Sequence, residues 1–121
     1  MFIRILLFVC IVLSLGAKDA LDEVNKERKD KSLTPFVRDT GLTEGAMKCA
    51  DFRAARLIQG HTSNDFSFLP KDVFAPAAGC AAWPQGEGWG ACCTYDREYT
   101  RAGAAFSIGK DGRRYMHLFV R

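Results

Sequence analysis

The sequence predicts a single α+β domain, with helices in its first half and an antiparallel hairpin at its carboxyl end. Apolar residues recur at helical spacing from Ala20 to near Ser32 and again over 42–59. Two strand-like runs, 99–108 and 114–120, flank a Gly-Lys-Asp-Gly turn, which is a strong hairpin signal. Helices that precede an antiparallel pair of strands are typical of helices packed on a sheet.

The first helix has a cap at one end and a breaker at the other. Asp19 can accept a hydrogen bond from the first turn, and acidic residues follow it at the positive end of the helix dipole. Leu21 and Val24 mark the side that we expect to be buried. Pro35 restricts the residue before it to extended conformations, so the chain crosses to the second helix in an open form.

The second helix is predicted to begin at Asp39 or Thr40, either of which can serve as its cap. Gly60 suits the left-handed position that ends many helices. This places His61 just past the carboxyl end of the helix, facing whatever packs above it. A lone histidine there is also favoured as a cap or as a hydrogen-bonded structural group.

The middle of the chain is less regular. The stretch 62–76 contains turn-forming residues and three phenylalanines, and we interpret it as a connection pinned by aromatic side chains. A short third helix is predicted over 77–83, where Pro84 stops it, and 85–90 is predicted to be a glycine-rich loop.

The amino-terminal segment predicts export. One positive charge precedes an apolar run of about a dozen residues, and small residues follow it. A membrane anchor is the alternative, but a spanning helix needs about 20 apolar residues. We therefore interpret 1–17 as a signal peptide and 18–121 as the mature domain, secreted and extracellular, or periplasmic in a bacterium.

Four cysteines follow the signal segment, and an even number in an exported chain predicts two disulfides. They are Cys49, Cys80, Cys92 and Cys93. A bridge between the adjacent Cys92 and Cys93 would be strained. We expect Cys49 and Cys80 each to pair with one of those two, without a preference between the two arrangements. A zinc site is not favoured, because Cys49 and Cys80 stand too far from other ligands in sequence.

Charge excludes one class of partner. The formal net charge of +3 comes from lysines and arginines spread along the chain, so nucleic acid binding is not expected. No membrane association is expected once the signal segment is removed. The sequence also has no nucleophile motif of the G-x-S-x-G kind.

Two parts of the chain resemble the CAP family, also called the SCP domain, which includes cysteine-rich secretory proteins, antigen 5 and pathogenesis-related protein 1. The first half contains the patterns "L..VN..R", "L.P...D..L...A...A" and a closing "GH". The tail, "TRAGAAFSIGKDGRRYMHLFVR", is similar to the closing strands of that family. The resemblance implies an α-β-α sandwich with two longer amino-terminal helices, a short third helix and a carboxyl-terminal hairpin that completes a small sheet.

Many CAP domains line a central cleft with two histidines and two acidic residues that can hold a metal ion. The resemblance places His61 at the first histidine and Trp89 at the second, and the acidic positions have no clear counterpart. We therefore expect no metal and no other cofactor, and a ligand cleft formed by His61, Trp83, Glu87 and Trp89. His117 is expected to be a packing residue between strands.

These observations favour a non-enzymatic binding module over an enzyme. We expect a monomer that binds a small lipophilic ligand or an extracellular partner protein, with Trp89 lining an apolar recess beside His61. The aromatic side chains could instead fill the core. The alternatives are a metal-assisted hydrolase built around His61 and an unrelated small secreted inhibitor or toxin.

Overall fold

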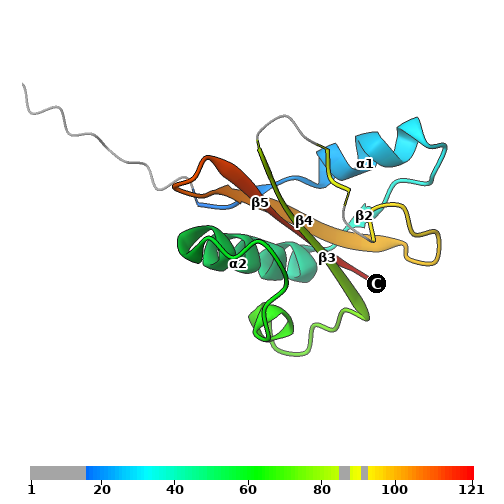
Figure 1. Ribbon diagram of the computed structural model, residues 1–121. Coiled ribbons are helices and arrows are strands. Elements are labelled where there is room, and N and C mark those ends of the chain that lie inside the picture. The colour runs from blue at the N-terminus through cyan, green and yellow to red at the C-terminus, as the bar shows by residue number, and fades with distance from the viewer. Residues whose placement is uncertain (1–15, 85–87, 91–92) are drawn as a thin grey trace, which may run out of the picture.

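The computed structural model describes residues 16–84, 88–90 and 93–121 (Figure 1). The helices of this part are α1 (Leu21–Asp30), α2 (Thr40–Arg56) and the short 3-10 helix η1 (Asp65–Phe68). The strands are β1 (Lys18–Asp19), β2 (Val37–Arg38), β3 (Ala77–Pro84), β4 (Arg101–Ile108) and β5 (Arg113–Val120). Most of the predicted signal segment, residues 1–15, lies outside the described residues. Ala17 already belongs to the fold, because its N–H donates to Asp51 at 2.8 Å.

The five strands form one sheet with β4 and β5 at its centre. β5 pairs antiparallel with β4 on one side and with β3 on the other. The short strands β1 and β2 both pair with β4, antiparallel and parallel respectively. The predicted hairpin is confirmed, with Gly112 at a φ of 79° in its turn, where a residue without Cβ is favoured.

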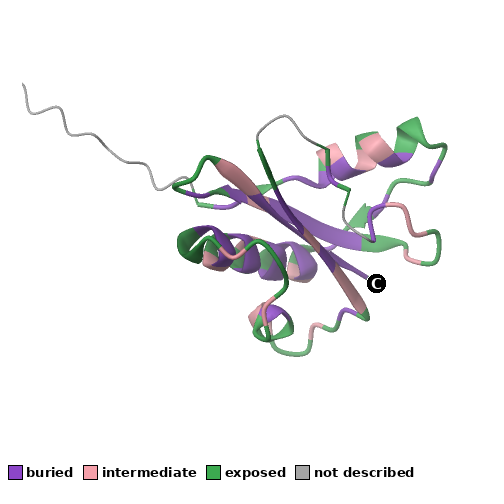
Figure 2. Ribbon diagram, viewed as in Figure 1, coloured by how far each residue is buried: buried purple, intermediate pink, exposed green. Residues whose placement is uncertain are grey.

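The two α-helices lie on opposite faces of the sheet (Figure 1). Because side chains alternate along a strand, each central strand supplies one set of residues to each face. The α1 face packs Leu21, Val24, Trp89, Met116 and Leu118 together. The α2 face packs Leu42, Ala46, Cys49, Ala50 and Phe119. Figure 2 shows the buried residues along β4, β5 and the inner side of α2.

The predicted CAP sandwich is wrong, because the described residues form two α-helices and the sheet is the larger part of their fold. The segment predicted as a third helix is β3, which pairs with β5 from Ala77 to Pro84. Its alanines favour a helix locally, but β5 offers a full row of backbone hydrogen-bonding groups. Pro84 does not break the sheet, because β3 is an edge strand and the proline stands at its end. What remains of the expectation is a mixed α+β domain.

The boundaries of α2 follow the predicted cap at one end and differ at the other. The Asp39 carboxylate accepts a hydrogen bond from the N–H of Leu42 at 3.0 Å, which confirms Asp39 as the cap. The helix ends at Arg56, and Leu57, not Gly60, takes the left-handed conformation with a φ of 55°. The chain therefore leaves the helix three residues earlier than predicted, which gives the loop before His61 room to turn back.

Asp39 also ties the start of α2 to the sheet, and this predicts an acid-sensitive contribution to stability. Its carboxylate accepts hydrogen bonds from Arg101, at 3.1 Å, and from Arg121. Burial favours the neutral acid, but the Leu42 N–H and the two arginines outweigh it and lower the pKa of Asp39. A lowered pKa in the folded state gives stability that is present above the unfolded value, about 3.9, and is lost as the pH falls through the folded value.

We expect Asp39→Ala to lower the free energy of unfolding by about 1–2 kcal/mol at pH 7, because it removes both the cap and the partly exposed ion pairs. Asp39→Asn keeps a capping side chain and should cost less. Urea unfolding at pH 7 and pH 3 checks the linkage, since the gap between wild type and Asp39→Asn should shrink at pH 3. A gap independent of pH would contradict this role for the carboxylate.

Candidate metal centre

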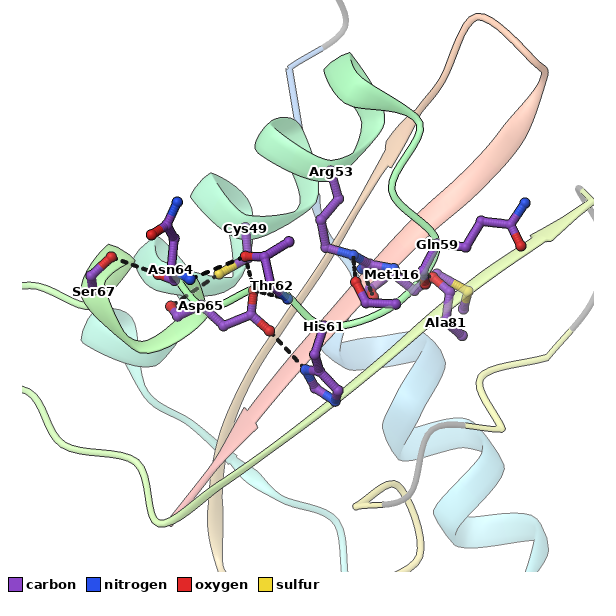
Figure 3. Close-up of polar contacts among 11 residues, drawn as sticks. Cys49, Arg53, Gln59, His61, Thr62, Asn64, Asp65, Ser67, Ala81 and Met116 are labelled. Atoms are coloured by element: carbon purple, nitrogen blue, oxygen red, sulfur yellow. Dashed lines mark hydrogen bonds and ion pairs between the residues drawn. The ribbon is translucent and has the colours of Figure 1, made fainter.

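The buried guanidinium of Arg53 holds the loop that carries His61. Arg53 lies on the sheet side of α2 and is fully buried. It donates hydrogen bonds to four backbone carbonyl oxygens, those of Gln59, Gly60, Ala81 and Met116 (Figure 3). The first two belong to the loop after α2 and the others to β3 and β5. The loop is therefore fixed against the sheet immediately before His61.

Asp65 organises the next turn of the chain. One oxygen of its carboxylate accepts hydrogen bonds from the N–H and the hydroxyl of Thr62, at 3.2 and 2.8 Å. The other oxygen lies 2.7 Å from Nδ1 of His61 (Figure 3). Burial alone would raise the pKa of Asp65, but the hydrogen bonds from His61 and Thr62 outweigh it and lower that pKa. Asp65 is therefore a buried carboxylate in its charged form.

His117 lies next to His61, on the α2 face of β5. Its side chain is fully buried, and neither ring nitrogen has a hydrogen-bond partner among the residues the structure describes. The ring of His61 meets it edge to face, with 6.0 Å between the ring centroids, and Phe119 packs at 4.6 Å. Burial lowers the pKa of His117 to about 3, with the charges of Arg53 and His61 acting in the same direction. The imidazole is therefore neutral at physiological pH and has a lone pair to offer.

Cys49 completes the cluster from α2. Its thiol is fully buried and donates to the backbone oxygen of Asp65 at 3.3 Å (Figure 3). Burial raises the pKa of this thiol well above its usual range, and Asp65 and Cys80 add to the effect. Without a metal ion, Cys49 is therefore a neutral thiol.

The three side chains form a compact ligand set. Potential ligand atoms of Cys49, Asp65 and His117 all lie within 4.8 Å of one another, and all three residues are buried. Sulfur, imidazole nitrogen and carboxylate oxygen are the ligands of zinc in proteins, at about 2.0–2.3 Å. A tetrahedral ion with such bonds places its ligands about 3.3–3.8 Å apart, so these ligand atoms would have to draw closer together to bind one. The chain thus brings together three buried ligand atoms of the kinds that zinc selects.

The ligand cleft predicted from the sequence is not assembled in the same way. His61 lies on the α2 face beside His117, whereas Trp89 is 1% exposed in the core beneath α1. The sheet separates the two residues. Trp89 therefore fills the core, as the alternative interpretation of the aromatic residues proposed. Glu87, the acidic member of the predicted cleft, lies outside the described residues.

Trp83 also lies on the α1 side of the sheet. It lines a recess of about 290 Å³ together with Glu27, Gly88, Gly90 and Tyr95. The Glu27 carboxylate is already engaged there, since it accepts hydrogen bonds from the backbone N–H of Trp89 at 2.8 Å and from the Tyr95 hydroxyl at 2.9 Å. The recess is therefore separate from His61 and does not extend the metal cluster.

The cysteines are divided between the two faces of the sheet. Cys49 packs on the α2 face, and Cys80 faces the same side because it lies directly opposite His117 across the β3–β5 pair. Cys93 is buried on the α1 face. No disulfide joins any two of these three cysteines, and Cys92 lies outside the described residues. The predicted pairings of Cys49 or Cys80 with Cys92 or Cys93 remain predictions.

The sequence indicated His61 as a site residue, but it gave Cys49 and His117 other roles and did not single out Asp65. His61 and Asp65 stand four residues apart, but His61 lies outside the helices, where that spacing would have predicted a contact. His117 was expected to be a packing residue, and its proximity to Cys49 depends on how α2 crosses β5. The spacing of residues in the sequence does not reveal where α2 crosses β5.

Comparison with protein-family models, with curated proteins and with solved structures found no match to this chain. The CAP resemblance therefore has no support from these comparisons, and the site has to be judged on its own geometry. In the described part of the chain, neither helix combines the length and the apolar character that crossing a bilayer requires.

Proposed function

We propose that this protein is a non-enzymatic binding domain whose ligand is a single zinc-like metal ion held by Cys49, Asp65 and His117. The observation that carries the proposal is the fully buried imidazole of His117, whose two nitrogens have no hydrogen-bond partner among the described residues. A buried polar group without a partner costs roughly 1–3 kcal/mol, so native proteins seldom keep one. A metal ion between His117 and its two buried neighbours would satisfy that group.

The chemistry of the three side chains supports this choice of ion. Imidazole must be neutral to ligate a metal, and His117 is neutral because of its burial. Asp65 supplies a negative charge, and a thiol that coordinates a metal ion is deprotonated, with its proton released to solvent. His61 would act from outside the ligand set, because its hydrogen bond to Asp65 orients the carboxylate.

The same three residue types also occur in cysteine nucleophile sites, but burial argues against that function here. A nucleophile needs a thiolate and access for its substrate. Cys49 is fully buried, and its raised pKa keeps the thiol protonated. An organic substrate would have to reach the interface between α2 and the sheet, where Cys49 and His117 are fully buried.

Zinc titrated into the reduced protein should bind with a stoichiometry of one. His117→Phe and Cys49→Ala should each weaken binding by about 100-fold or more, because the loss of even an outer partner typically costs 10–100-fold. His61→Ala should weaken zinc binding by about 10–100-fold, because His61 is an outer partner of the site and not a ligand. Competition with a coloured chelator measures the affinities, and cobalt substitution should show a sulfur-to-metal absorption band that Cys49→Ala removes.

Cys93→Ala is the matched control, since it deletes a buried thiol on the α1 face and should leave zinc affinity unchanged. Thermal unfolding of each metal-free variant establishes that it is folded. If His117→Phe does not fold, Cys49→Ala still decides the question. Zinc affinity that is the same in wild type, Cys49→Ala and Cys93→Ala would overturn the proposal.

A further inference from the structure

The cysteine of the ligand set has a second cysteine close to it. Cys80 on β3 is the direct cross-strand neighbour of His117, and such neighbours have Cβ atoms about 4.5–5.5 Å apart on one face of the sheet. The Cys49 thiol lies within 4.8 Å of a ligand nitrogen of the same His117. Both sulfur atoms therefore approach one imidazole, Cys49 from the helix and Cys80 from the strand.

The distribution of the other cysteines favours this pair. Cys93 is buried among α1-face residues, so the sheet stands between it and Cys49. Cys80 is near enough to Cys49 to contribute, after burial and Asp65, to the raised pKa of that thiol. A disulfide requires Cα atoms about 4.4–6.8 Å apart, so the proposed pair must come within that range when it forms.

We propose that Cys49 and Cys80 form a disulfide that excludes the metal ion, so that the site exists in a reduced, metal-binding form and an oxidised, cross-linked form. Exclusion of the metal ion rests on the proposed function, whereas formation of the disulfide does not. The cross-link removes the thiolate ligand, since a disulfide sulfur is a far weaker donor to zinc than a thiolate. Bound metal protects Cys49 in turn, because its sulfur is then coordinated.

The oxidant is a disulfide of low molecular weight, R–S–S–R. Cys80, which is partly exposed, attacks one sulfur as the thiolate and releases R–S⁻. Cys49 then attacks the sulfur of Cys80 in the mixed disulfide, which reaches it within the interface and so needs no substrate access from solvent. In this step the Cys49 thiol gives up its proton, and the second R–S⁻ leaves and takes up a proton. Two electrons pass from the cysteines to the oxidant, and the two thiol protons end on the two R–SH products.

Peptide mapping after oxidation by glutathione disulfide tests the pairing. Trypsin releases Cys49 in the peptide 49–53, but it leaves Cys80, Cys92 and Cys93 together in 72–97. Additional cleavage after Glu87 separates Cys80 from the other two. Without metal, we expect 49–53 linked to 72–87 under non-reducing conditions. A link from 49–53 to 88–97, or no link at all, would overturn the inference.

The same samples test whether the disulfide prevents zinc binding. The oxidised protein should lose zinc affinity by about 100-fold or more and regain it on reduction, and zinc added first should suppress the cross-link. Cys80→Ala should bind zinc as wild type does and become insensitive to the oxidant, whereas Cys93→Ala should remain sensitive. If the cross-link forms but the reduced protein binds no zinc, the proposed function fails and the disulfide stands. If reduced protein binds zinc and no cross-link forms, the disulfide alone fails.

Discussion

Replacing Arg53 with methionine is expected to lower the free energy of unfolding by about 3–5 kcal/mol. Hydrogen bonds from a charged donor contribute about 1.5–3 kcal/mol each, and the loss of four of them is partly offset because a buried charge is also removed. Methionine fills a similar volume but donates no hydrogen bond. Four carbonyl oxygens from the loop after α2, β3 and β5 would lose their donor. Each buried acceptor left unsatisfied costs roughly 1–3 kcal/mol, reduced where water can enter.

Arg56→Met provides the control, because Arg56 lies one turn later on α2 with its side chain exposed. Its guanidinium stacks on Phe52 at 3.8 Å and donates to one carbonyl oxygen at 3.3 Å. We expect a loss below about 0.5 kcal/mol, as is usual for surface positions. Urea unfolding of both variants measures the difference. Equal losses would show that the Arg53 hydrogen bonds are not what holds the loop.

Gly103→Ala is expected to cost about 3 kcal/mol or more, at the upper end of what overpacking does in cores. A Cβ at this position of β4 would overlap backbone atoms of Leu42 and Thr43, at the start of α2. Backbone cannot rotate away as a side chain can, so the helix would have to lift from the sheet. Because α2 carries Cys49, the same variant should also weaken zinc binding by the proposed centre.

Gly60→Ala makes the matching comparison. A Cβ there meets no atom within 4 Å, and the residue has no positive φ. The same chemical change should therefore alter stability by less than about 0.5 kcal/mol. Thermal and urea unfolding of the two variants give the contrast directly. A Gly103→Ala protein as stable as Gly60→Ala would mean that α2 does not pack on β4 as closely as the structure has it.

Elements with their own local signals were predictable from the sequence. The Asp39 cap begins α2, and Gly112 supplies the positive φ of the β4–β5 turn, so both elements are specified by residues within or beside them. β3 was not predictable in this way. Its run of alanines has helical propensity, and only the free edge of β5 makes it a strand.

The contacts of the candidate site are also partly local and partly dependent on tertiary packing. The contact between His61 and Asp65 spans only four residues, but it was not predicted from the sequence, because neither residue lies in an α-helix where that spacing would imply a contact. The contacts among Cys49, Asp65 and His117 join α2, η1 and β5, and the register of β5 against β3 decides that Cys80 lies opposite His117. Helix packing and strand register are set by the burial of both faces of the sheet, which is a property of the whole chain. For that reason the two α-helices and the hairpin followed from local sequence signals, whereas the meeting of His61, His117, Cys49 and Cys80 on one face depends on the packing of the whole chain.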